Sequence, residues 1–114
     1  MKSTAQRKRE RKRERAERLW GPPGFADFVR ALPCLKCAHT SQARCYGPSE
    51  LHHDPTAARG GTWKDVTPLG RDCHTGSPRS RHRHPGGHVG FWSDLGATRE
   101  EANAEIQLLW EAED

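Results

Sequence analysis

The apolar residues of this chain fall into short groups whose spacing predicts a few short elements. Phe25, Phe28, Val29 and Leu32 recur at helical spacing, and Pro33 ends the helix that they predict. A second helix is expected at about 98–112, because Thr98-Arg-Glu-Glu101 is a capping box that opens it. The face of this helix that should pack on the domain is formed by Ala102, Ile106, Leu109 and Trp110.

Between the two helices the pattern favours strands. Residues 50–53 and 63–69 are short strand candidates, and a loop with Gly and Pro joins them. A turn or short helix begins at Arg71 and is stopped by Gly76 and Pro78. We therefore expect a small α+β domain over residues 21–114.

Residues 1–20 form a basic arm with almost no apolar residue before Leu19 and Trp20. The arm holds nine Lys or Arg and three Glu, a net charge of +6, and Gly21-Pro-Pro-Gly24 separates it from the rest. Helix formers dominate, so the arm should be flexible or helical and could become helical on DNA. This charge suggests a polyanionic partner, and a solvated tail that keeps the protein soluble explains it equally well.

The composition limits the chain to one small domain with little apolar surface to bury. Only 32% of its 114 residues are apolar, and it has 11 Gly and 8 Pro. A bound metal is the usual substitute for a missing core. We recognise neither a membrane span nor a signal peptide in the pattern, so we expect a cytoplasmic protein. In that compartment cysteines bind metal more often than they form disulfides.

The cysteines have the spacing of a metal knuckle. Cys34 and Cys37 are two residues apart, so both thiolates can reach one tetrahedral ion. Cys45 and Cys73 complete a set of four that could form one structural site, and His39 is an alternative ligand.

Two adjacent histidines, His52 and His53, lie on the first strand candidate, and Cys73-His74 follows the second. Adjacent side chains on a strand point to opposite faces. One histidine can therefore bind a metal while the other is left for proton transfer. The alternative is a pair of exposed surface histidines, which the presence of Cys73-His74 makes much less favoured.

A basic run follows, with three arginines and two histidines in the six residues 79–84. Guanidinium groups pair bidentately with phosphate, so contact with a nucleic-acid backbone is the natural role, and an exposed loop is the alternative. The basic side chains that we expect to contact nucleic acid are those of Arg59, Lys64, Arg79, Arg81 and Arg83.

Taken together, Cys-x-x-Cys, His-His, Pro-Leu-x-x-x-Cys-His and His-x-x-Gly-x-x-x-Phe resemble the HNH endonuclease superfamily over about residues 33–112. In particular the chain resembles the phage-type branch that includes the RecA-dependent nuclease Ref and short phage recombination nucleases. This resemblance implies a zinc-stabilised ββα-metal (His-Me finger) domain with flanking helices. It also implies a DNA endonuclease that leaves 3′-hydroxyl and 5′-phosphate ends.

The resemblance also implies residue roles. His53 matches the general base, and Asp65 falls where the family has the polar residue that orients this base. His52 and His74 match ligands of the catalytic divalent ion, which would be Mg²⁺, Mn²⁺ or Zn²⁺. His84 fits the third ligand position, with His82 as the competing choice and His88 as a weaker one.

The chain departs from the family pattern at Gly70, where many members have a cysteine that binds the structural zinc. Cys45 could replace it, which would make Cys34, Cys37, Cys45 and Cys73 the zinc ligands. A second departure is the break from Gly76 to Pro85, which interrupts the family helix near His82 and His84.

The expected function is a metal-dependent HNH-type endonuclease, a hydrolase in which His53 takes a proton from water. Expected partners are double- or single-stranded DNA and a recombinase filament in a bacterial or phage-infected cell, with no membrane. Two alternatives remain: a zinc-stabilised nucleic-acid-binding module without catalysis, and a purely structural zinc protein.

Overall fold

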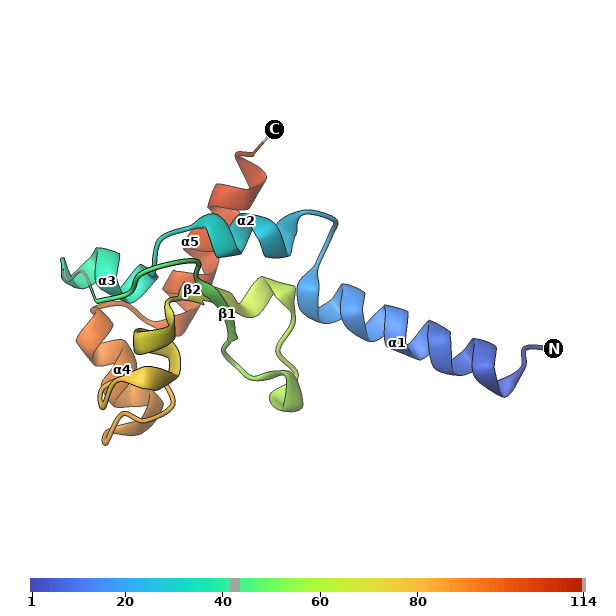
Figure 1. Ribbon diagram of the computed structural model, residues 1–114, viewed down its shortest axis with the longest axis horizontal. Coiled ribbons are helices and arrows are strands. Elements are labelled where there is room, and N and C mark those ends of the chain that lie inside the picture. The colour runs from blue at the N-terminus through green and yellow to red at the C-terminus, as the bar shows by residue number, and fades with distance from the viewer. Residues whose placement is uncertain (42–43, 114) are drawn as a thin grey trace.

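The computed structural model describes residues 1–41 and 44–113, and within them the chain forms helices around one two-stranded hairpin (Figure 1). Positions 42–43 and 114 of the expected domain lie outside the described residues. The elements in chain order are α1 (Thr4–Trp20), α2 (Phe25–Ala31), α3 (Leu35–Thr40), β1 (Glu50–His53), β2 (Val66–Leu69), α4 (Gly87–Leu95) and α5 (Arg99–Glu111). This arrangement confirms the α+β class.

The hairpin pairs β1 with β2 in antiparallel register, with Glu50 opposite Leu69 and His53 opposite Val66. The second strand begins three residues later than expected, because Trp63–Asp65 forms a 3₁₀ turn, η2. The cause is a local capping box: the Asp65 carboxylate accepts a hydrogen bond from the Thr62 amide at 2.9 Å. After β2 the chain enters a π-helical turn, η3 (Asp72–Gly76), which is the short helix expected there.

The small core is divided into two apolar clusters. One lies under α2, β2 and α5 and is built from Phe25, Val29, Val66 and Ile106. The other lies where α3, α4 and η3 meet, and it contains Leu35, Leu69, Cys34, Cys73, Phe91, Trp92, Leu95 and Ala102. Two cysteines therefore form part of the second cluster, so a metal bound there would hold the α3–α4 end of the molecule together.

Helix α5 confirms the capping box at Thr98 and the burial of Ala102 and Ile106, but Leu109 is 44% exposed. The buried face turns instead toward Asn103, which is only 6% exposed. Its side-chain amide donates to the Asp54 carbonyl at 2.9 Å and its oxygen accepts from Thr67 at 2.7 Å. A polar residue thus takes a core position because it joins α5 to both strands.

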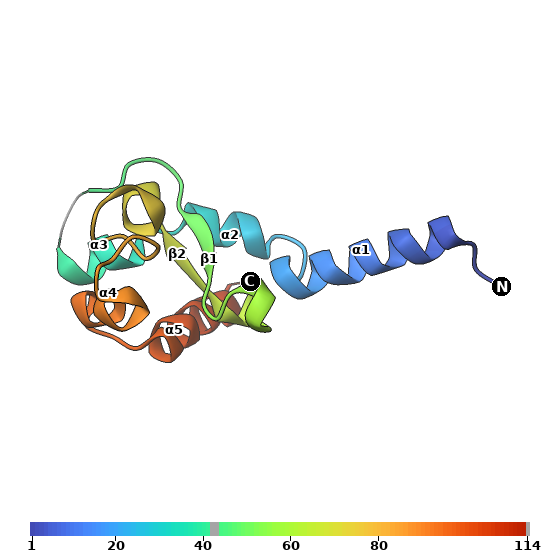
Figure 2. The same cartoon turned by 90° about the horizontal axis from the view of Figure 1, so that it is seen from below.

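Helix α1 extends away from the rest of the molecule (Figures 1 and 2). It is a continuous helix that opens with a capping box between Ser3 and Gln6, a signal that we did not recognise in the sequence. Only Leu19, at its last turn, is buried. The longest dimension of the molecule, 55 Å, reflects this projection.

None of the helices in the described residues is long and apolar enough to cross a membrane.

Candidate metal centres

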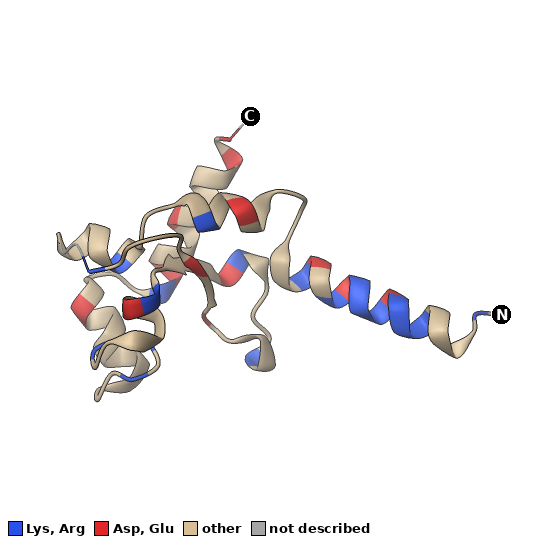
Figure 3. Ribbon diagram, in the orientation of Figure 1, with Lys and Arg blue, Asp and Glu red and all other residues tan. Residues whose placement is uncertain are grey.

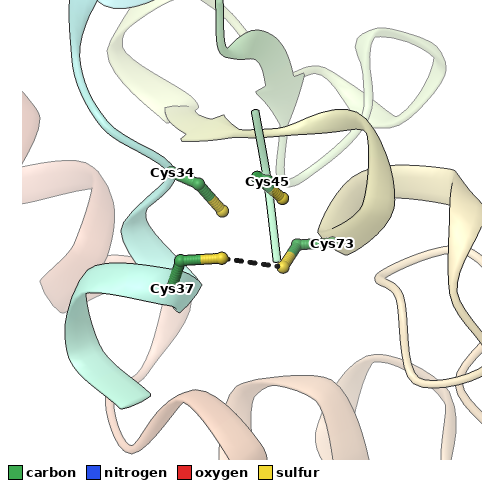
Figure 4. Close-up of side chains that lie close together, drawn as sticks. All are labelled: Cys34, Cys37, Cys45 and Cys73. Atoms are coloured by element: carbon green, nitrogen blue, oxygen red, sulfur yellow. Dashed lines mark hydrogen bonds between the residues drawn. The ribbon is translucent and has the colours of Figure 1, made fainter. Parts of the chain in front are cut away.

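The four cysteines come together from three separate segments (Figure 4). Cys34 and Cys37 lie at the start of α3, Cys45 in the loop before β1, and Cys73 in η3. Their sulfur atoms all lie within 4.8 Å of one another, and the Cys37 and Cys73 sulfurs are 3.7 Å apart. Zinc–sulfur bonds of about 2.3 Å in a tetrahedron place sulfurs about 3.8 Å apart. This cysteine cluster is consistent with a structural zinc ion.

Cys45 occupies the space that a side chain at position 70 would need. A Cβ atom added to Gly70 would lie 2.5 Å from the Cys45 sulfur and 2.2 Å from its Cβ. In many members of the family that the motifs resemble, position 70, just after β2, carries a cysteine. Here the loop before β1 places the Cys45 thiol in that space instead. His39, the alternative ligand, lies outside the cluster with its Nε2 3.4 Å from a Glu105 carboxylate oxygen.

The thiols affect one another's protonation. A hydrogen bond from Cys73 lowers the pKa of Cys34 to about 5, although burial opposes this shift. Donating that hydrogen bond raises the pKa of Cys73, and burial raises the pKa of Cys45 to about 11. The cluster therefore holds one thiolate easily and resists further charge. A divalent cation would remove this repulsion, since it binds thiols in their deprotonated form.

Three histidines form a second cluster around the hairpin. His52 comes from β1, His74 from η3, and His82 from the turn after it, with ring centroids 4.9 to 5.2 Å apart. The Nε2 atoms of His74 and His82 are 3.2 Å apart. Two imidazole nitrogens on one tetrahedral ion at about 2.05 Å would be about 3.3 Å apart. This histidine cluster has the spacing of a three-ligand metal site.

Carboxylates orient two of these rings. Glu50 lies 3.0 Å from Nδ1 of His74, and Asp54 lies 3.2 Å from Nε2 of His52. A carboxylate accepts, so each of these nitrogens carries the proton and donates it. His74 then offers Nε2 and His52 offers Nδ1 to an ion. Metal-binding histidines commonly have such a carboxylate partner on the other nitrogen.

Asp54 is the centre of a buried ionic network that sequence reasoning missed. Its carboxylate, 2% exposed, accepts from Arg81 Nε at 2.8 Å, from Trp92 Nε1 at 2.9 Å and from Arg99 Nη1 at 3.3 Å. Burial alone would raise the pKa of Asp54, but the hydrogen bonds from His52 and Arg81 hold it well below its usual range. The available signal was an acid two residues from a histidine, which is weak by itself.

Burial also sets the protonation of the histidines. The pKa of His52 is lowered to about 4, chiefly by burial, and that of His82 is lowered for the same reason. Both rings are therefore neutral near pH 7, which is the form that binds metal.

His53 lies apart from the histidine cluster, on the other face of β1, as strand alternation predicts. Its Nε2 lies 2.7 Å from the carbonyl oxygen of Leu19, and its ring packs edge-on against Trp20 at 5.4 Å. A carbonyl can only accept, so Nε2 carries the proton and Nδ1 is left as an acceptor. Asp65 does not orient this ring as we expected. Its carboxylate bonds to Thr62, and the end of α1 takes that place.

The third histidine of this cluster is His82, and His84 does not join it. His84 lies against α4, with its Nε2 2.8 Å from an Asp94 carboxylate oxygen, and its Nδ1 accepts from the Gly86 amide at 2.9 Å. His88 is exposed on α4. The motif match selected His84, whereas the turn after η3 places the exposed side chain of His82 beside His74.

The arginines of residues 79–84 each make a contact within the protein. Arg81 is bound to Asp54, Arg79 makes two 2.8 Å hydrogen bonds to Asp94, and Arg83 donates to the Gly76 carbonyl at 2.7 Å. The pKa of Asp94 is lowered to about 2, mainly by Arg79. Arg59 is exposed on the 3₁₀ turn η1 (Ala57–Arg59), and the Lys64 ammonium lies 5.7 Å from the Trp63 ring centroid.

No protein-family model matches this chain, and no curated protein or solved structure is similar to it at a significant level. The functional argument therefore depends on the geometry of the two clusters and their surroundings.

Proposed function

We propose that the protein is a metal-dependent DNA endonuclease of the HNH type, built on a ββα-metal site. The observation that carries the proposal is the histidine cluster: three imidazole rings from β1, η3 and the following turn converge at ligand distance. A hairpin followed by a helical turn is the arrangement that the motif resemblance implied. The cysteine cluster beside it holds η3 and α3 in place.

In this proposal His52, His74 and His82 hold one divalent ion. Three protein ligands leave a further coordination position for water or substrate, which is typical of catalytic sites. When bound, the ion would polarise the scissile phosphate and stabilise the developing charge on the leaving oxygen. Asp54 and Glu50 fix the tautomers and orientations of the ligating rings.

His53 is the proposed general base. Its Nδ1 is free to accept a proton because the Leu19 carbonyl holds the proton on Nε2. The last turn of α1 therefore orients the base, which is the task that the resemblance assigned to Asp65. The substrate would bring water and phosphate to the side of β1 where His53 lies.

Helix α1 supplies the expected affinity for the DNA backbone. Lys and Arg positions outnumber Glu positions along this exposed helix (Figure 3). Such contacts are independent of sequence and sensitive to salt.

Plasmid nicking tests the proposal. Wild-type protein with Mg²⁺ or Mn²⁺ should nick supercoiled DNA, whereas His53→Ala and His74→Ala should lose at least about 100-fold in rate. His88→Ala, which changes an exposed histidine outside both clusters, is the matched control and should retain full activity. Equal nicking by wild type and His53→Ala would overturn the assignment of the base, and equal nicking by His74→Ala would overturn the site.

A zinc-stabilised DNA-binding module without catalysis is the second candidate. The observation that favours it is the position of His53, which lies on the opposite face of β1 from the metal-ligand candidate His52. It predicts salt-dependent DNA binding by wild type and no nicking with any divalent ion.

A further inference from the structure

A groove beside β1 combines aromatic and cationic side chains. It has a volume of about 490 Å³ and is lined chiefly by Trp20, Arg30, Tyr46, Glu50, Leu51 and Arg71. These residues come from the end of α1, from α2, from the loop before β1, from β1 itself and from the start of η3. We call this feature the β1 groove.

Two aromatic rings of the β1 groove are exposed to water. Tyr46 is 85% exposed and Trp20 is 43% exposed, although large aromatic side chains are usually covered. The other tryptophans take part in the core: Trp63 and Trp110 pack against Phe25, and Trp92 is buried. The exposed rings therefore contribute little to folding and are available to a ligand with flat apolar faces.

The charges of the groove favour an anionic ligand. Arg30 and Arg71 are exposed and lie in its lining, whereas its acid, Glu50, is hydrogen-bonded to His74 at 3.0 Å. Arg30 makes one ion pair, at 3.1 Å, with Asp27, which is itself 89% exposed at its side chain. Exposed pairs of this kind are weak, so both guanidinium groups can turn to phosphate.

The groove borders the proposed catalytic residues on two sides. Trp20 packs 5.4 Å from the ring of His53, and Glu50 orients the metal-ligand candidate His74. A strand held in the groove would therefore pass its phosphates close to both. Rings that stack on bases and arginines that bind phosphates are the two components of a single-strand binding surface.

From these observations we propose that the β1 groove binds single-stranded DNA, with unpaired bases stacked on Tyr46 and Trp20 and phosphates paired with Arg30 and Arg71. Duplex DNA does not fit this chemistry, because its bases are already stacked on one another. The proposal deepens the proposed function, on which it rests for the placement of the substrate. It names unpaired DNA as the substrate class, which includes the strands that open transiently in a supercoiled plasmid.

The test is binding of a fluorescein-labelled thymidine 12-mer to the zinc-loaded full chain without added Mg²⁺ or Mn²⁺. An abasic 12-mer with the same phosphates separates stacking from charge. Tyr46→Ala should weaken binding of the thymidine oligomer about tenfold and leave the abasic oligomer unchanged. Tyr46→Phe keeps the ring and should bind like wild type, and so should Leu108→Ala, which alters a residue on α5 that is 66% exposed.

The arginines give an independent readout. Each of Arg30→Gln and Arg71→Gln should reduce the slope of log affinity against log salt by about 0.7, for both oligomers.

Two results would overturn the proposal that the β1 groove binds single-stranded DNA. One is equal affinity of wild type for the thymidine and abasic oligomers, and the other is an unchanged affinity of Tyr46→Ala for the thymidine oligomer. Neither affects the nuclease proposal, which is tested by nicking of duplex plasmid. Conversely, an active His74→Ala variant would overturn the nuclease proposal. The binding measurement would still test the β1 groove independently.

Discussion

Cys45 shows how a single residue can restore a site that the sequence motif leaves incomplete. Its sulfur lies 2.5 Å from where the Cβ of a side chain at position 70 would be. The sequence supported this substitution, because the chain has only four cysteines and Gly70 stands where a ligand was expected. The reason that it works is steric: only a glycine at 70 leaves room for the loop that carries Cys45.

This geometry predicts a compensating swap. Cys45→Ser should lower the zinc content of the purified protein, because hydroxyl groups are poor zinc ligands compared with thiolates. Adding Gly70→Cys to a Cys45→Ala variant should restore it, since the new sulfur would point into the vacated space. Zinc per chain, measured by atomic absorption, is the readout. Undiminished zinc in Cys45→Ser would contradict the ligand assignment.

Asp54 should be the most sensitive residue outside the two clusters. Asp54→Asn keeps the shape of the side chain but leaves Arg81 and Arg99 without their buried counter-charge. Breaking a buried ion pair by removing one partner costs about 3–5 kcal/mol. Urea unfolding should show a decrease of this size. Glu100→Gln is the matched control, because it removes an exposed partner of Arg99 and should cost at most about 1 kcal/mol.

The positions of the site side chains could be predicted from the sequence only where local spacing determines them. Strand alternation correctly separated His52 from His53. The choice between His82 and His84 depends on how a Gly- and Pro-rich turn directs two side chains, and no local rule fixes that. Asp65 was expected to orient His53, but its carboxylate accepts a hydrogen bond from the Thr62 amide in a local capping box.

At the scale of elements, α1 is joined to the domain through very few residues. Leu19 is buried, Trp20 packs on His53, and Gly21 lies so close to Trp63 that a Cβ there would be 2.9 Å from its ring. Gly21 also has φ of 78°, which other residues rarely adopt. The direction of the helix is thus set at its last turn, next to the proposed base.

Removing residues 1–18 tests the role of α1 while it keeps Leu19 and Trp20. The shortened chain should bind duplex DNA more weakly, with a salt slope reduced by about 0.9 for each phosphate that the protein no longer neutralises. Fluorescence anisotropy between about 50 and 200 mM salt measures this slope. Replacing Glu10, Glu14 and Glu17 by Gln should have the opposite effect. A slope that does not change on truncation would identify α1 as a solvated tail.

Elements were predicted best where a local signal marks their ends. Thr98 opens α5 and Pro33 follows the end of α2, as the sequence indicated. The strand expected from Trp63 begins only at Val66, because the capping box at Thr62 folds residues 63–65 into a 3₁₀ turn. In the sequence alone these residues looked like the start of the strand. Leu109 and Trp110 were both expected on the packed face of α5. Trp110 does pack against Phe25 and Phe28, but Leu109 is exposed.

For the whole molecule, the two apolar clusters are too small to stabilise the fold easily. The α3–α4 end depends on the cysteine cluster, because Cys34 and Cys73 are themselves core residues. Without a bound ion, a Cys34 thiolate would lie in that core beside the protonated thiols of Cys45 and Cys73. We therefore expect the apoprotein to lose ordered packing around Trp92, with near-UV circular dichroism as the measurement, and to recover it when zinc is restored.

Because two of the thiols have raised pKa values, the stabilisation by zinc should depend steeply on pH. Near pH 7, Cys45 and Cys73 are protonated in the metal-free protein, because burial raises the pKa of the first and a donated hydrogen bond raises that of the second. Zinc must displace at least these two protons, so its affinity should rise about 100-fold for each unit of pH increase. At saturating, buffered free zinc this adds about 2.7 kcal/mol of stability per unit.

Zinc-dependent stability should therefore increase with pH. Cys34 adds to this dependence only near pH 5 and below, where its own thiolate becomes protonated. Melting temperatures at fixed free zinc, measured from pH 6 to pH 8, should rise steeply for the zinc-bound protein. They should rise less steeply for the apoprotein, in which the lowered pKa of Cys34 alone makes stability increase with pH. Proton release on zinc addition, followed with a pH indicator at pH 7, should be two or more per ion. His52 adds nothing to that count, because its pKa of about 4 leaves it neutral. Release of one proton or fewer would mean that at least one of these two thiols is already ionised, and it would contradict the dependence of about 100-fold per unit of pH.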